Sequence, residues 1–320
     1  MARFSIGTAI GEAFGLIGRR PFAVFAWGLL MVAPMFGALG LMFPAMGEIF
    51  ANMPDPDAGA AGDSAFSEGM VAQMMQFQMA SLLANLGQYV GLAIVYTAIF
   101  RAVLRPTERS FFSLRVGMDE LRVAVAGLAI GIGIYIVMIF AVLLCVALGF
   151  GLWAQGEAVA LWTCGIVGLA MFVALLWGLA RVSLIAPASV LYRDFAFAQG
   201  WKLAAGKGWP LLGMLLLLYL MVVVIYVVVI IIVAVAAGGV IAATASAWEG
   251  AGHDANPFEG MSAWMAVNWP WLVVGGLVLS WVYGAFMTLM VAPFASACRQ
   301  LAETSEPLPA VDSASSEPAL

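Results

Sequence analysis

Long stretches without a charged residue alternate with short polar segments along the whole chain. Each stretch is longer than the roughly 20 residues that a helix needs to cross the hydrocarbon core of a bilayer. The six uncharged runs are 21–47, 69–100, 123–156, 158–180, 208–248 and 260–298. This pattern predicts an all-α polytopic membrane protein with six transmembrane helices. We interpret the longest run as one long or tilted helix, because two crossings there would break the charge pattern described next.

The charges between the runs predict the orientation of the helices. Each run has a base at one end and an acid at the other, so six crossings place all 13 Lys and Arg residues on one side. The other side then carries only acids. Because Lys and Arg collect in the cytoplasmic loops of membrane proteins, we expect both termini to lie in the cytoplasm.

A short amphipathic segment precedes each pair of runs. These segments cover roughly residues 4–18, 107–121 and 194–206. Helices of this kind lie in the membrane interface with the apolar side facing the lipid. We therefore predict three hairpins, each preceded by a cytoplasmic interfacial helix. The corresponding pseudo-repeats are 4–105, 107–193 and 194–299.

The ends of the even-numbered runs support this repeat. Pro187 precedes Arg193 by six residues, as Pro293 precedes Arg299, and Arg105 holds the equivalent place in the first hairpin. The three repeats make up one transmembrane domain, 1–302. The acidic, Pro- and Ser-rich segment 303–320 is typical of a disordered cytoplasmic tail.

Composition narrows the classes of function. Hydrophobic residues make up 64% of the chain and charged residues 10%, against about 25% charged in soluble domains. The net charge of −5 argues against a nucleic-acid partner. Three isolated cysteines and one histidine provide no metal-ligand spacing, and no phosphate-binding loop motif is present. We expect no catalytic residue, no metal and no cofactor.

Two groups of residues are candidates for binding. Basic residues near the predicted cytoplasmic boundary attract anionic lipid headgroups, and the candidates are Arg101, Arg105, Arg181, Arg193 and Lys202. In the last run, small residues recur at four-residue intervals, among them Gly276, Ser280, Gly284 and Thr288. Such a face lets helix backbones approach closely. We interpret it as packing within the chain, with a homodimer contact as the alternative.

The stretch from Arg181 to Leu212 reads RVSLIAPASVLYRDFAFAQGWKLAAGKGWPLL. It resembles the membrane domain found beside some bacterial glycerophosphodiester phosphodiesterases and related free-standing multi-helix membrane proteins. The matching positions are Arg181, Leu184, Pro187, Ala188, Val190, Trp201, Leu203, Gly206 and Trp209. Many relatives place an acid after the Val, where this chain has Leu191, Tyr192 and Arg193. The resemblance implies a module of the bacterial inner membrane and transfers no catalytic residue.

These observations lead to two hypotheses of different class. The first is a non-enzymatic membrane module that binds lipid or a partner protein, with a homo-oligomer as one form of partnership. The second is a transporter or channel for a small or lipid-like solute, which internal repeats favour. A polar cavity at mid-depth, lined by Gln88, Thr97 and Tyr135, would support the second hypothesis.

Overall fold

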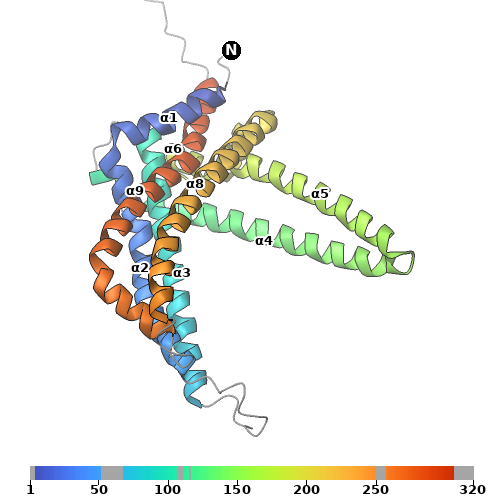
Figure 1. The fold of residues 1–320 in the computed structure, drawn as a ribbon. Coiled ribbons are helices and arrows are strands. Elements are labelled where there is room, and N and C mark those ends of the chain that lie inside the picture. Colours follow the sequence, from blue (N-terminus) through green and yellow to red (C-terminus); the bar gives the residue numbers. More distant parts are fainter. Residues whose placement is uncertain (1–3, 52–67, 107–110, 115–116, 249–256, 306–320) are drawn as a thin grey trace, which may run out of the picture. The chain divides into compact units, whose positions relative to one another are not determined.

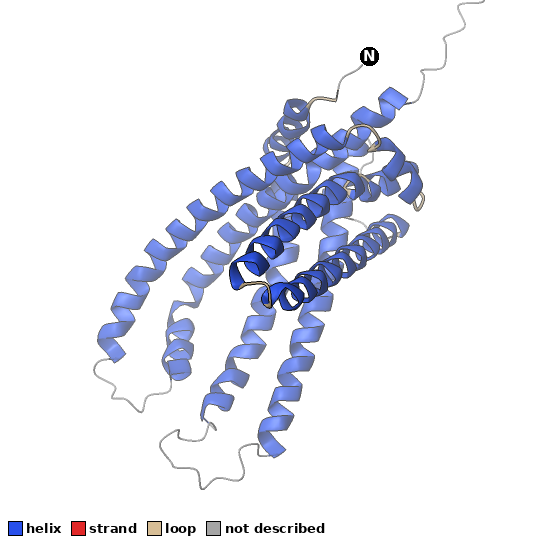
Figure 2. Ribbon diagram, turned by 90° about the vertical axis from the view of Figure 1, so that its right-hand side faces the viewer, coloured by secondary structure: helices blue, strands red, loops and turns tan. Residues whose placement is uncertain are grey.

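The computed structural model describes residues 4–51, 68–106, 111–114, 117–248 and 257–305. These residues form helices joined by turns, and no strand occurs among them (Figure 2). In chain order the helices are α1 (Ile6–Arg19), α2 (Pro21–Ala51), α3 (Glu68–Leu104), the short 3-10 helix η1 (Phe111–Ser113), α4 (Met118–Trp153), α5 (Glu157–Val182), α6 (Ile185–Tyr192), α7 (Phe197–Leu203), α8 (Gly208–Trp248) and α9 (Pro257–Ser305) (Figure 1). The predicted all-α class is confirmed.

Several of these helices have the length and composition of membrane spans. Within the described residues, five helical stretches are long and apolar enough to cross a membrane. They are Met74–Leu104, Met118–Trp153, Glu157–Tyr192, Gly208–Ile231 and Val267–Thr304. A sixth is reached if α1 and the first part of α2 are counted together as one bent span. The architecture is that of a multi-pass membrane protein, and the run 208–248 forms a single helix, α8.

The second of the predicted interfacial segments differs from the expectation. The described part of 107–121 contains η1 and the start of α4, and no helix spans the segment. Phe112 and Ser113 have φ values of 52° and 56°, in the left-handed region that a right-handed helix excludes. The predicted amphipathic helix is therefore wrong for residues 111–114. The first predicted segment, 4–18, overlaps α1 up to residue 18, and the third contains α7.

A second difference concerns the two prolines that the repeat places in equivalent positions. Pro187 lies in the first turn of α6, after a break at Ser183 and Leu184. Proline is tolerated in the first turn of a helix, where its missing N–H has no intrahelical partner to lose. Ser183 lies at the break and donates a hydrogen bond from Oγ to the Ala180 carbonyl at 2.9 Å. Pro293, by contrast, lies inside α9, which continues to Ser305.

The predicted tail begins within the last helix. Residues 303–305 are the last residues of α9, so helix extends past the boundary expected at 302. The rest of the predicted tail, 306–320, lies outside the described residues.

The chain divides into two compact units. Unit 1 comprises residues 1–19, 96–219 and 288–320, and unit 2 comprises 20–95 and 220–287. Of the 13 Lys and Arg residues in the chain, only Arg20 belongs to unit 2. Unit 1 therefore contains every candidate basic residue.

Helix contacts in unit 2 depend on glycine. On α2, a Cβ atom added at Gly28 would overlap the carbonyl oxygen of Ser280 on α9. A Cβ atom added at Gly284 would overlap the carbonyl oxygen of Val24. Trp27 is fully buried beside this contact. Without side chains at these two glycines, the backbones of α2 and α9 come close enough for direct dispersion contact, which drives helix association in lipid.

In unit 1, α4 and α5 run alongside each other as an antiparallel hairpin (Figures 1 and 2). The shorter helices α6 and α7 pack tightly. A Cβ atom added at Gly200 of α7 would lie 2.6 Å from the Ile185 Cα atom of α6. The Ser189 hydroxyl also accepts a hydrogen bond from the Ala196 N–H at 3.2 Å. This packing fixes α7, which carries part of the candidate site.

Candidate functional site

Arg101 is the most deeply buried of the candidate basic residues. It lies near the end of α3 and is 4% exposed. Its Nη2 atom lies 2.5 Å from Oε1 of Glu120, which is itself 6% exposed in the first turn of α4. Arg101 Nη1 donates to the Ser113 carbonyl at 3.1 Å, and Nε lies 3.6 Å from Asp119 Oδ2. The guanidinium is thus surrounded by acceptors of the protein itself.

Arg105 extends this network to a third helix. Its Nη1 atom lies 3.2 Å from Asp119 Oδ2, and its Nη2 atom donates a hydrogen bond to the Val190 carbonyl of α6. Asp119 also receives Arg122 Nη1 at 2.9 Å. The network therefore joins the end of α3 and the start of α4 to the last turn of α6.

These contacts indicate a structural role for Arg101 and Arg105. A buried charge is stable only when it is paired and hydrogen-bonded, and both arginines meet this condition inside the protein. The carboxylates also lie at the start of α4, where the helix dipole favours negative charge. Binding of lipid headgroups by these two arginines remains a prediction.

Arg299 makes a related contact at the other end of the chain. Its Nη2 atom lies 2.8 Å from Oε1 and 2.9 Å from Oε2 of Glu12 on α1. Its Nη1 atom donates to the Val103 carbonyl of α3 at 2.8 Å. Arg299 thus joins the end of α9 to α1 and to the end of α3.

We expect Glu12→Gln to lower the free energy of unfolding by about 1–2 kcal/mol, because the pair is bidentate but partly exposed. The shift of the unfolding midpoint in mixed detergent micelles measures this change. Glu303→Gln is the control, since Glu303 is 72% exposed and lies 4.0 Å from the same arginine. Equal midpoints for the two variants would contradict the structural role of Glu12.

Arg181 has a different environment. Its guanidinium carbon lies 5.0 Å from the ring centroid of Trp177 on α5 and 4.8 Å from that of Trp201 on α7. Both distances are within the range of cation–π attraction. The Nε atom is buried and has no hydrogen-bond partner among the described residues. Arg181 also has no ion-pair partner among those residues. We call Arg181, Trp177 and Trp201 the Arg181 clamp.

The start of α8 lies against this clamp. A Cβ atom added at Gly208 would be 3.1 Å from Trp177 Nε1 and 3.8 Å from Arg181 Cδ. Gly208 is the first residue of α8, so the positive end of a long helix lies beside Arg181, whose Nε has no hydrogen-bond partner in the part of the chain that the structure describes. Phosphate groups bind at helix N-termini for the same electrostatic reason. The clamp is therefore suited to an anion.

The two remaining basic candidates differ from each other. Arg193 ends α6 with φ 55° and ψ 34°, so it is a left-handed C-cap and has a structural role in the backbone. Lys202 lies on α7 and lines a cavity that is described below. Sequence reasoning identified Arg181 and Lys202 as candidates, but it did not identify Trp177 beside Arg181 or the pairing of Lys202 with Lys207 around one cavity. Their proximity depends on how α5, α7 and α8 meet.

The predicted packing residues lie on α9. Ser280 and Thr288 are fully buried, and Ser280 Oγ donates to the Gly276 carbonyl at 2.7 Å. A Cβ atom at Gly276 would lie 3.4 Å from the ring of Phe36 on α2. With the Gly284 contact to α2, this face is directed at helices of the same chain.

Comparison of the chain with protein-family models, with curated proteins and with solved structures gives no match. The resemblance of residues 181–212 to the membrane domain of bacterial phosphodiesterases therefore stays a prediction, and the function has to be argued from the site itself.

Proposed function

We propose that this chain is a non-enzymatic integral membrane module that binds anionic lipid. The proposal places six spans in three hairpins across the bacterial inner membrane, with both termini in the cytoplasm. The observation that carries it is the Arg181 clamp, in which a guanidinium lies against two tryptophan rings and its buried Nε has no hydrogen-bond partner among the described residues.

The clamp has the chemistry needed to hold a phosphate. Contact with the two rings positions the guanidinium, whose N–H groups can bind phosphate oxygens in pairs. Trp177 and Trp201 are 41% and 45% exposed, and tryptophan concentrates at the level of lipid headgroups. Arg181 lies in the last turn of α5, where the apolar helix ends. A lipid phosphate at this level would reach the guanidinium without a charge entering the hydrocarbon core.

The structure gives less support to transport. Thr97 is fully buried, whereas Tyr135 is 69% exposed. A fully buried side chain has no surface on a water-sized cavity, so these two residues of unit 1 do not line one polar cavity together. We therefore prefer a binding module to a carrier. A lipid ligand is favoured over a partner protein because Arg181, which has no ion-pair partner among the described residues, lies against two tryptophans of the kind that concentrate at lipid headgroups.

Arg181→Gln should lower the affinity for an anionic lipid by roughly tenfold or more, because a charge-assisted phosphate contact is lost. The measurement is native mass spectrometry of the full chain in mild detergent, titrated with phosphatidylglycerol or phosphatidylcholine. Arg181→Lys should also bind more weakly, since an ammonium cannot form the paired contact of a guanidinium.

Arg19→Gln is the matched control. It removes one exposed cation that donates from Nε to the Gly15 carbonyl of its own helix, so lipid affinity should stay near the wild-type value. Equal affinity of the wild type for the two lipids, or unchanged affinity in Arg181→Gln, would overturn the proposal.

A further inference from the structure

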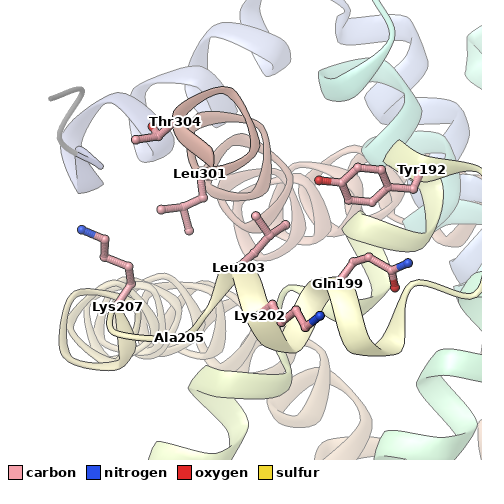
Figure 3. A pocket seen from close by; sticks show the side chains of 8 residues that line it. All are labelled: Tyr192, Gln199, Lys202, Leu203, Ala205, Lys207, Leu301 and Thr304. Carbon is pink, nitrogen blue, oxygen red and sulfur yellow. The ribbon is translucent and has the colours of Figure 1, made fainter. Parts of the chain in front are cut away.

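A second basic site lies on another side of α7. A cavity of about 390 Å³ opens between α7, the connection to α8, and the last turns of α9 (Figure 3). Its lining combines two cations, polar groups and leucines. The residues that matter for the argument are Tyr192, Lys202, Leu203, Lys207, Leu301 and Thr304. All belong to unit 1.

The cavity has a polar part and an apolar part. Leu203 and Leu301 point toward each other across it, and Tyr192 directs its hydroxyl toward the same space (Figure 3). Lys207 extends toward the end of α9, near Thr304 (Figure 3). Such a lining suits an amphiphile, because the leucines offer an apolar surface while the ammonium and hydroxyl groups donate hydrogen bonds.

The charged side chains that line the cavity favour a ligand of opposite charge. Among the described residues of the lining, both charged side chains are lysines and none is a carboxylate. The nearby Glu303 is directed to Arg299 at 4.0 Å. Lys207 directly precedes α8, so the positive end of that helix adds to the two ammonium groups. An anionic group is therefore favoured.

The size of the cavity is consistent with part of a lipid. Pockets for small ligands commonly enclose about 300–1,000 Å³, and this cavity lies at the lower end of that range. It can hold a compact headgroup and the beginning of an acyl chain.

We propose that this cavity binds a phosphate-bearing amphiphile with a small headgroup. The phosphate lies between Lys202 and Lys207, and the first part of the acyl chain lies on Leu203 and Leu301. The site is separate from the Arg181 clamp, because Trp201 faces Arg181 while Lys202 and Leu203 line the cavity. The proposal does not depend on lipid binding by the clamp.

The test uses the full chain in mild detergent and native mass spectrometry, with phosphatidic acid as the probe and phosphatidylcholine as the neutral comparison. The double variant K202Q/K207Q should weaken phosphatidic acid binding roughly tenfold to a hundredfold, since charge-assisted contacts are removed. K202R/K207R should retain most of the affinity. Arg181→Gln should leave it within about threefold of the wild type, so the clamp and the cavity can succeed or fail separately.

Free glycerol 3-phosphate distinguishes two sources of the phosphate. Displacement of phosphatidic acid by this soluble ester would identify the phosphate group alone as the ligand. Retention of the lipid in its presence would show that the acyl chain is also required. Both results support the site. Equal binding of phosphatidic acid and phosphatidylcholine, or wild-type binding by K202Q/K207Q, would overturn it.

Photocrosslinking keeps the proposal testable if the double variant fails to fold. A phosphatidic acid analogue with a photoreactive group near the start of its acyl chain is added to the wild-type protein in nanodiscs. We expect adducts on the residues that line the cavity, which are Tyr192, Gln199, Lys202, Leu203, Ala205, Lys207, Leu301 and Thr304. Adducts confined to other parts of the chain would refute the site.

Discussion

Arg101→Met is expected to destabilise the protein by about 3–5 kcal/mol, the largest effect of any single charge removal in unit 1. The substitution leaves Glu120 buried without its partner at 2.5 Å, and Oε2 of Glu120 already has no hydrogen-bond partner among the described residues. Asp119 keeps Arg105 and Arg122, so the uncompensated charge is concentrated on Glu120. The unfolding midpoint in mixed detergent micelles, followed by far-UV circular dichroism, measures the loss.

A double-mutant cycle separates the ion pair from its surroundings. Glu120→Met alone should cost less, because Arg101 keeps the Ser113 carbonyl and a longer contact to Asp119. The double variant Arg101→Met/Glu120→Met should recover more than half of the loss, since two apolar side chains replace two buried charges. If the double variant were as unstable as the sum of the two singles, the pair would not be coupled and the structural role of Arg101 would be wrong.

The helical framework could be predicted from the sequence because lipid imposes one simple requirement. Every backbone N–H and C=O group of a helical span has to find its hydrogen-bond partner within the same segment. An uncharged run longer than about 20 residues therefore predicts a helix. The uncharged run 208–248 and helix α8 coincide for this reason. The positions where one helix ends and the next begins depend on the local surroundings instead. Pro187 lies in the first turn of a new helix, whereas Pro293 lies inside a continuous one, and the six-residue spacing to the next arginine is the same in both cases.

The partners of the basic residues could not be predicted in the same way. Positive charge near the predicted boundary favours lipid binding for every arginine alike, yet Arg101 and Arg181 lie in opposite environments. Glu120 is 19 residues from Arg101 along the chain, and their contact depends on the turn at Phe112 and Ser113. The sequence contains both acids of that network, but periodicity does not indicate which base each one meets.

The arginine contacts also bear on the predicted threefold repeat. Arg105 ends the first proposed repeat and pairs with Asp119, at the start of the second. Arg299 ends the third and pairs with Glu12, in the first helix of the first repeat. Each arginine also donates to a backbone carbonyl near the end of another repeat, at Val190 and Val103 respectively. Both contacts therefore run from the end of one proposed repeat to the first part of another. The repeat itself stays a prediction.

Gly284→Ala is expected to destabilise the protein by about 3 kcal/mol, at the upper end of the usual cost of overpacking. The added Cβ atom would overlap the carbonyl oxygen of Val24, and helix backbone cannot rotate away as a side chain can. Gly28→Ala should have an effect of similar size, because its Cβ atom would overlap the Ser280 carbonyl. The unfolding midpoint in mixed micelles measures both.

Gly275→Ala is the matched control on the same helix. A Cβ atom at Gly275 meets nothing within 4 Å, so alanine should be neutral or stabilise α9 by up to about 1 kcal/mol through its higher helix propensity. Measuring the variants at several protein concentrations separates packing within the chain from a homodimer contact. If α9 packs on α2 of the same chain, the loss in Gly284→Ala is independent of concentration. If the small-residue face is a dimer contact, Gly284→Ala instead lowers the dimer fraction and leaves the monomer as stable as Gly275→Ala.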